Sequence, residues 1–146
     1  MTKTATVEDA VSIAARAHKG QKDKAGAPYL LHPLRLMMRM DTEAAMMAAV
    51  LHDVVEDTGW TLERLRGEGF PDEVIEAVEC LTRREGEGYE EFVERARAHP
   101  IARRVKIADL EDNMNIRRVS QLGAKDLERL EKYHRAWRVL TNAGDA

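Results

Sequence analysis

Hydrophobic positions recur at the spacing of an amphipathic helix along almost the whole chain, and no segment alternates between apolar and polar residues as a β-strand does. The pattern and its flanking cap and breaker residues predict helices over approximately residues 7–17, 32–40, 43–57, 62–65, 72–84, 89–98, 100–118 and 125–141. Thr6 and Asp9 predict a capping box at the start of the first helix. We therefore expect an all-α protein.

The third predicted helix differs from the others in its polarity. Residues 44–51 are apolar on every side of a helix, which indicates a central position in the fold rather than a place on its surface. Two segments lack any helical period. Residues 20–28, with two glycines and a proline, predict a loop, and the Glu-Gly-Glu-Gly sequence at 85–88 predicts a mobile connector. We expect one helical bundle arranged around the helix that contains residues 44–51.

Length and composition fit a single domain over residues 1–146. Hydrophobic residues make up 44% and charged residues 34% of the chain, as in ordinary globular domains. No apolar run approaches the ~20 residues that cross a bilayer, so no membrane partner is expected. Cys80 is the single cysteine, which excludes an intramolecular disulfide and predicts a reducing cytoplasm. The net charge of -3 argues against a nucleic-acid partner, but it allows an anionic small molecule in a locally basic cleft.

One polar cluster interrupts the apolar pattern near the end of the central helix. On a continuous helix, at about 100° per residue, one arc carries His52, Asp53, Glu56 and Asp57, and the apolar residues beside them lie on the opposite arc. Several carboxylates beside an apolar surface are costly unless a cation or basic groups neutralise them. The adjacent histidine and aspartate offer one nitrogen and one oxygen ligand, a mixture that suits Mn, Fe or Zn better than Ca or Mg. An exposed acidic helix face is the alternative interpretation.

Further metal ligands would have to come from other segments. His32 lies at the predicted start of the second helix and is one candidate. Asp109 is an acid flanked by apolar residues, with Asn113 one helical turn later on the same face. The alternatives are a capping or core role for His32 and, for Asp109, a buried ion pair with Arg103 or Arg104.

Three separated motifs resemble the HD-type hydrolase domain of the RelA/SpoT family. The first lies within residues 17–33 and reads Ala-His-Lys-Gly-Gln, Gly-Ala-Pro-Tyr and His-Pro. The second, Leu-His-Asp-Val-Val-Glu-Asp-Thr at 51–58, is similar to the HDxxED motif of that family. The third lies within residues 106–114 and reads Lys-Ile-Ala-Asp and Asn-Met. The order and spacing agree over approximately residues 5–120, which implies a single-domain helical HD fold with a central metal-binding helix.

The resemblance implies a cofactor and a reaction. One divalent metal ion, Mn²⁺ in this family, would be held by His32, His52, Asp53 and Asp109. The reaction implied is hydrolysis of the 3′-pyrophosphate of a guanosine alarmone such as ppGpp, so the partner would be a small phosphorylated nucleotide. Since the 146 residues include no synthetase or regulatory domain, the resemblance leads us to expect a stand-alone hydrolase similar in size to the small alarmone hydrolases.

The resemblance also implies roles for residues around the metal. Glu56 and Asp57 would orient or activate the attacking water, and Asn113 would contact the ribose. The other substrate contacts implied are Lys22, Lys24 and Tyr29.

The sequence departs from the family at substrate positions. Asp23 stands where the family has an arginine that helps to hold the guanine base, and Ala25 replaces a serine. Leu110 and Asp112 replace an arginine and a histidine in the third motif. Three hypotheses stay open: a ppGpp pyrophosphohydrolase, an HD-type phosphatase for another nucleoside or dinucleotide, which Asp23 favours, and a catalytically silent module that binds a nucleotide or a protein. The oligomeric state is left open.

Overall fold

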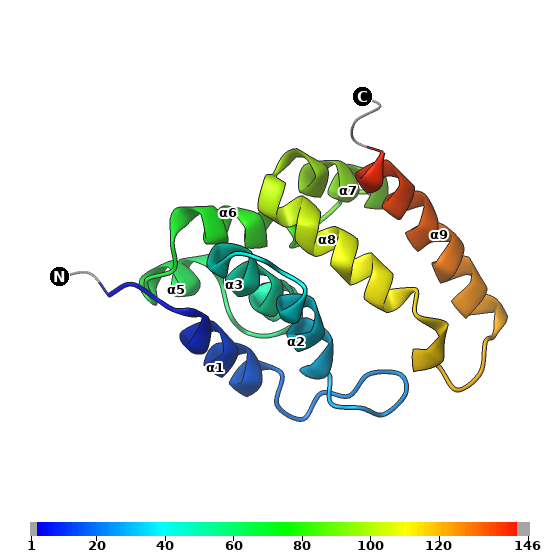
Figure 1. The fold of residues 1–146 in the computed structure, drawn as a ribbon, viewed down its shortest axis with the longest axis horizontal. Coiled ribbons are helices and arrows are strands. Elements are labelled where there is room, and N and C mark those ends of the chain that lie inside the picture. The colour runs from blue at the N-terminus through cyan, green and yellow to red at the C-terminus, as the bar shows by residue number, and fades with distance from the viewer. Residues whose placement is uncertain (1–2, 143–146) are drawn as a thin grey trace.

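The structure is a computed structural model that describes residues 3–142. Its helices are α1 (Val7–Ala17), α2 (Leu31–Met38), α3 (Glu43–Leu51), α4 (Val54–Asp57), α5 (Leu62–Gly67), α6 (Asp72–Cys80), α7 (Tyr89–Ala98), α8 (Pro100–Asn113), the 3₁₀-helix η1 (Ile116–Arg118) and α9 (Ala124–Thr141) (Figure 1). The all-α prediction is confirmed, and Thr6 and Asp9 form the predicted capping box. None of the helices within residues 3–142 is both long and apolar enough to cross a membrane.

Helix α3 lies at the centre of the fold, as its apolar sequence predicts. It packs against α1, α2, α6 and α8, and residues 47–51 are all buried. Ala48 and Ala49 let the neighbouring helices approach closely, in a core shared with Leu36 and Val105. Helix α9 lies on the far side of α8 from α3 and completes a smaller core there (Figure 1). Helix α3 thus lies between the first two helices of the chain and α8.

The central helix is shorter than predicted. Helix α3 ends at Leu51 and α4 begins at Val54, so His52 and Asp53 interrupt the continuous helix expected to reach residue 57. The Nδ1–H of His52 donates to the carbonyl oxygen of Ala49 at 2.7 Å, and a continuing helix would need that carbonyl for the N–H of Asp53. The break places the histidine and the aspartate at a helix end and not along one helical face.

Two other helices end before the predicted residue for a similar reason. Helix α6 ends at Cys80 rather than near residue 84. Just after this end, the hydroxyl of Thr82 donates to the carbonyl oxygen of Val78 at 2.8 Å. Helix α8 ends at Asn113 rather than near residue 118, and the side chain of Asn115 accepts a backbone N–H at 3.2 Å to start η1. Polar side chains of these types compete with the backbone for helical hydrogen bonds, which ends the helix locally.

The Glu-Gly-Glu-Gly segment is held by an arginine, although its composition predicts a mobile connector. Arg95 donates from Nε and Nη2 to the two carboxylate oxygens of Glu87, at 2.6 and 2.8 Å. Arg95 also donates to the carbonyl oxygens of Thr82 and Glu79, at 2.7 and 3.0 Å. One guanidinium therefore joins α7 to the end of α6 and to the turn between them.

This ion pair predicts a pH dependence of stability. Hydrogen bonds from Arg95 lower the pKa of Glu87 from its ordinary value of 4.5 to about 2. A carboxyl whose pKa is lower in the folded state stabilises the protein above its ordinary pKa, and this contribution is lost as the pH falls through the folded value. We expect the melting temperature of Glu87→Gln to fall less steeply than that of the wild type between pH 4.5 and about pH 2. Parallel curves would contradict this, and Glu85→Gln, exposed in the same turn, is the control.

Candidate functional site

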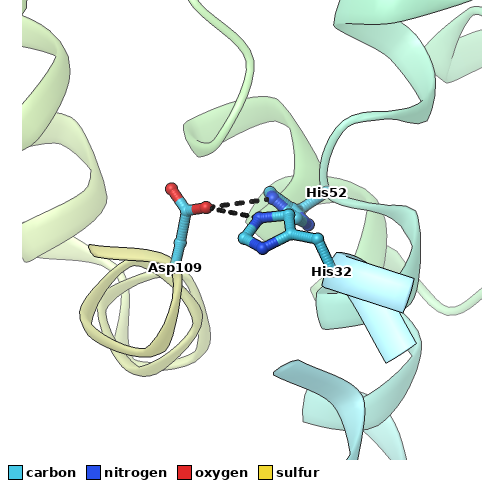
Figure 2. Close-up of side chains that lie close together, drawn as sticks. All are labelled: His32, His52 and Asp109. Carbon is cyan, nitrogen blue, oxygen red and sulfur yellow. Dashed lines mark hydrogen bonds and ion pairs between the residues drawn. The ribbon is translucent and has the colours of Figure 1, made fainter. Parts of the chain in front are cut away.

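Three buried side chains from distant parts of the chain converge beside the end of α3. His32 lies in the first turn of α2, His52 follows α3, and Asp109 lies on α8 (Figure 2). One ligand atom of each lies within 4.8 Å of the others. The Nε2 of His32 lies 2.9 Å from Oδ1 of Asp109, and the Nε2 of His52 lies 3.5 Å from the same oxygen. The structure thus brings together three of the four ligands expected from the sequence around one point.

The second nitrogen of His52 is buried and has no hydrogen-bond partner within residues 3–142. Because the carbonyl of Ala49 only accepts, Nδ1 of His52 carries a proton, and Nε2 is the nitrogen left for a metal ion. Nε2 faces Oδ2 of Asp53 at 3.0 Å and Oδ1 of Asp109 at 3.5 Å, without an aligned hydrogen bond to either. An unpartnered nitrogen facing two carboxylates fits a bound cation, and the mixed nitrogen and oxygen donors suit a transition metal.

Asp53, the fourth expected ligand, contacts the group from the side of His52. Its Oδ2 accepts the hydroxyl hydrogen of Tyr29 and lies beside the imidazole of His52. Burial raises the pKa of Tyr29, and the charge of Asp53 raises it further, so the phenol stays a neutral donor. Burial raises the pKa of Asp53 too, but His52 outweighs this and keeps it below the ordinary value. Asp53 is therefore an ionised oxygen donor at the site.

Asp109 is held at both carboxylate oxygens. The Nζ of the buried Lys106 donates to Oδ2 at 3.0 Å, and the amide of Asn113 donates to Oδ1 at 3.2 Å. Burial raises the pKa of Asp109, but Lys106 and the two histidines lower it by more than burial raises it, so the pKa lies well below its ordinary value. The carboxylate therefore stays ionised and directs Oδ1 towards the nitrogens of His32 and His52.

The ion pair that the sequence suggested for Asp109 has a different partner. Arg103 donates to the carbonyl oxygen of Leu140, at 3.0 and 2.8 Å. Arg104 pairs with Asp41 at the surface. The alternative that an arginine neutralises Asp109 is wrong, because both arginines point away from α8 to these other groups.

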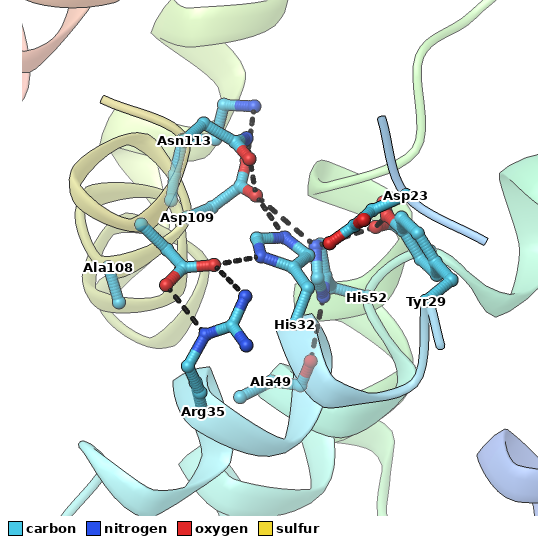
Figure 3. Close-up of polar contacts among 12 residues, drawn as sticks. Asp23, Tyr29, His32, Arg35, Ala49, His52, Ala108, Asp109 and Asn113 are labelled. Atoms are coloured by element: carbon cyan, nitrogen blue, oxygen red, sulfur yellow. Dashed lines mark hydrogen bonds and ion pairs between the residues drawn. The ribbon is translucent and has the colours of Figure 1, made fainter. Parts of the chain in front are cut away.

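The other nitrogen of His32 contacts a carboxylate that the sequence did not single out as a site residue. Nδ1 of His32 lies 2.5 Å from Oδ2 of Asp112. Arg35, which lies near His32 in Figure 3, donates to both oxygens of Asp112 at 2.9 Å. Arg118 donates to Oδ2 of Asp112 at 2.8 Å. The spacing in the sequence could have indicated this contact, because Asp112 lies three residues after Asp109 and therefore on the same side of the helix.

Glu56 and Asp57 lie on α4, next to the ligand group but outside it. Oε1 of Glu56 accepts the backbone N–H of Arg83 at 3.2 Å, and both side chains are exposed. Although both residues are exposed, loss of solvent on the side facing the protein and the charge of Asp53 raise the pKa of both carboxyls. A carboxyl with a raised pKa is better suited to exchange a proton near neutral pH than an ordinary one.

A cavity of about 300 Å³ adjoins the ligand group. Its walls include all four substrate contacts expected from the sequence, which are Lys22, Lys24, Tyr29 and Asn113. Asn113 also donates a hydrogen bond to Asp109 (Figure 3), and Tyr29 donates one to Asp53. These two residues therefore form the border between the cavity and the buried cluster.

Asp23 lines the cavity and organises the loop that carries it. Its Oδ1 accepts the N–H groups of Ala25 and Ala27, both at 2.9 Å, and Oδ2 accepts from Arg118 at 3.4 Å. Burial raises the pKa of Asp23, but these hydrogen bonds lower it below its ordinary value. The aspartate shapes the loop and holds Arg118, which also lines the cavity.

Comparison with known proteins places this arrangement in a family. Residues 10–132 match the family described as HD domain. A GTP pyrophosphokinase of Streptomyces coelicolor is 44% identical over 82 residues, which cover 53% of this chain and 9% of that protein. A guanosine-3′,5′-bis(diphosphate) 3′-pyrophosphohydrolase of Aquifex aeolicus is 31% identical over 121 residues, which cover 74% of this chain and 17% of that protein. The chain thus spans less than a fifth of the length of either relative.

A solved structure resembles nearly the whole chain. The similarity covers 98% of this chain and 87% of the other, with a TM-score of 0.72 and 26% sequence identity. That protein is described as a metazoan ortholog of SpoT that hydrolyzes ppGpp and plays a role in starvation responses. The resemblance inferred from the three motifs and the expected fold are confirmed, and the chain belongs to the HD domain family as an all-α HD bundle.

Proposed function

We propose that this chain is a metal-dependent phosphohydrolase that removes the 3′-pyrophosphate of ppGpp. The observation that carries the proposal is the buried, unpartnered Nε2 of His52, which faces two carboxylates at the edge of a cavity. The names of the similar proteins support the substrate. The Aquifex aeolicus relative is a guanosine-3′,5′-bis(diphosphate) 3′-pyrophosphohydrolase, and the metazoan protein is described as hydrolyzing ppGpp.

The metal ligands in this proposal are His32, His52, Asp53 and Asp109, with Mn²⁺ as the ion. Two imidazoles and two carboxylates form a donor set that Mn²⁺ accepts. When bound, a divalent ion supplies a Lewis acid for a phosphoryl oxygen and makes water more acidic. Lys106 and Asp112 lie behind the ligands and contact Asp109 and His32.

The remaining residues of the site act on water and on the substrate. Glu56 and Asp57 accept or relay the proton of the attacking water, and their raised pKa values suit this task. Lys22 and Lys24 attract the phosphates electrostatically from the cavity wall. Asn113 contacts the ribose from its place beside the metal ligands.

The cavity offers a place for the nucleoside. Its apolar and aromatic walls include Ile116, Val119, Leu122, Leu130 and Tyr133. A flat base fits between such side chains, because concave sites for small molecules combine an apolar lining with a few polar groups. Tyr29 and Asn113 then place the phosphate end of the nucleotide toward the ligand group.

A different nucleotide is the second candidate substrate, and the contacts of Asp23 favour it. The base-binding arginine of the family is absent from the loop, and the guanidinium of Arg118 reaches the same cavity from the segment that follows α8. Because the guanidinium of Arg118 enters the cavity from a different wall than an arginine at position 23 would, and lies next to Asp23, it would contact a different edge of the base. A cytoplasmic location stays a prediction from the sequence.

The test is an assay of the purified chain with a panel of nucleotides, in Mn²⁺ and in EDTA. We expect Mn²⁺-dependent release of pyrophosphate from ppGpp and no release in EDTA. Orthophosphate from other nucleotides would favour the second candidate. No turnover of any nucleotide with Mn²⁺ present would contradict both and support a silent nucleotide- or protein-binding module.

A further inference from the structure

Asp112 contacts a proposed metal ligand on the side away from the ligand group. Its Oδ2 lies 2.5 Å from Nδ1 of His32, while Nε2 of the same ring lies 2.9 Å from Asp109. Helix α8 thus contributes carboxylates to both nitrogens of one imidazole, from positions three residues apart. The carboxylate of Asp109 belongs to the proposed metal site, whereas the proposed function gives the carboxylate of Asp112 no role.

The two arginines around Asp112 fix the direction of this hydrogen bond. Arg35, which is labelled near His32 in Figure 3, donates to both carboxylate oxygens at 2.9 Å. Arg118 donates to Oδ2 at 2.8 Å. A carboxylate among guanidinium donors is ionised and only accepts, so Nδ1 of His32 carries the proton. The opposite nitrogen, Nε2, lies 2.9 Å from Oδ1 of Asp109 and faces the space shared with His52, so a bound cation would take the place of the proton on Nε2.

We propose that Asp112 is a positioning residue of the metal site, which holds the ring of His32 so that Nε2 is available to the ion. The proposal rests on the metal site of the proposed function. A carboxylate that accepts the distal N–H of a metal-bound histidine fixes the orientation of the ring and makes it a better ligand. Arg35 and Arg118 position Asp112 in turn, and Arg118 also lines the cavity.

A purely structural role for Asp112 makes a different prediction. The contact between Asp112 and Arg35 also joins α8 to α2, and such a link affects the stability of the fold with or without metal. Positioning of His32 affects metal affinity in a protein that is otherwise folded. Metal affinity must therefore be measured beside stability in EDTA.

The experiment compares Asp112→Asn with Glu111→Gln in the full chain. Glu111 is a matched control, because it is the preceding acid on α8 and accepts from Arg39 and from Trp137. The readouts are the dissociation constant for Mn²⁺ by titration calorimetry, the visible spectrum of bound Co²⁺, and melting in EDTA. We expect Asp112→Asn to weaken Mn²⁺ binding by about 10- to 100-fold and to alter the Co²⁺ spectrum, with no such change in Glu111→Gln.

Each outcome decides the proposal. Equal metal affinity of the wild type and a folded Asp112→Asn, or equal losses in both variants, would overturn it and leave the proposed metal site intact. Absence of metal binding by the wild type would overturn the metal site and this proposal together. If Asp112→Asn does not fold, Arg35→Gln replaces it, since it removes one of the groups that hold Asp112. A loss of metal affinity in that variant supports the proposal, and unchanged affinity overturns it.

Discussion

Replacement of Asp109 by asparagine is expected to abolish tight Mn²⁺ binding and to lower phosphohydrolase activity at least about 100-fold. Oδ1 of Asp109 is the oxygen that meets both His32 and His52, at 2.9 and 3.5 Å. An amide has almost the same shape but no charge, and it cannot neutralise a divalent ion. The measurements are the rate of nucleotide hydrolysis and the increase in melting temperature on addition of Mn²⁺, since a ligand that binds the folded state raises its stability.

The control for this variant is Asp41→Asn, which removes a carboxylate paired with Arg104 at the surface. We expect that variant to keep the Mn²⁺-dependent increase in melting temperature and the activity of the wild type. If Asp109→Asn kept both the Mn²⁺-dependent increase in melting temperature and the activity, the carboxylate of Asp109 would not be a metal ligand and the site assignment would be wrong.

Replacement of Lys106 by methionine is expected to give the largest loss of stability among single changes around the site. Lys106 is buried, and its Nζ donates to Oδ2 of Asp109 at 3.0 Å. Burial lowers the pKa of Lys106, but the charge of Asp109 raises it to about 12, so the ion pair is fully formed at neutral pH. Loss of the ammonium leaves the buried carboxylate of Asp109 with only His32, His52 and Asn113 as partners, and breaking such a buried pair costs about 3 kcal/mol. For a chain of this length the melting temperature in EDTA falls by roughly 10 °C.

The double variant Lys106→Met, Asp109→Asn separates charge from packing. Removal of both charges should restore most of the lost stability in EDTA, because no charged group is then left buried without a partner. A double variant as unstable as Lys106→Met alone would contradict the charge explanation and would attribute the loss to packing of the lysine stem. Added Mn²⁺ should reduce the difference in melting temperature between Lys106→Met and the wild type, because a bound cation neutralises part of the charge of Asp109.

The sequence predicts the helices well because their signals are local. The capping residues Thr6 and Asp9 and the uniformly apolar stretch at 44–51 act within a few residues, and the structure has a capped first helix and a buried central helix there. The convergence of His32, His52 and Asp109 could be anticipated only through the family resemblance. Their spacing along the chain does not by itself bring three helices together.

What the sequence did not predict depends on contacts between distant or competing groups. The break after Leu51 follows from a hydrogen bond between the His52 side chain and a backbone carbonyl, which a helical wheel does not contain. Asp112 and His32 are 80 residues apart, and the role of their contact depends on how α2 packs against α8. From the sequence, Asp23 was interpreted only as the replacement of an arginine. Its hydrogen bond with Arg118 could not be predicted, because Arg118 lies 95 residues later in the chain.

The apolar wall of the cavity and the proposed metal ligands come from different stretches of the chain. The last proposed ligand is Asp109, and the apolar wall of the cavity comes from residues 116–133, after the end of α8. Substitutions in that single stretch can therefore alter which base is accepted while the hydrolytic group keeps its composition. A graft of residues 116–133 between HD proteins would therefore exchange the apolar wall of the cavity and leave His32, His52, Asp53 and Asp109 in place.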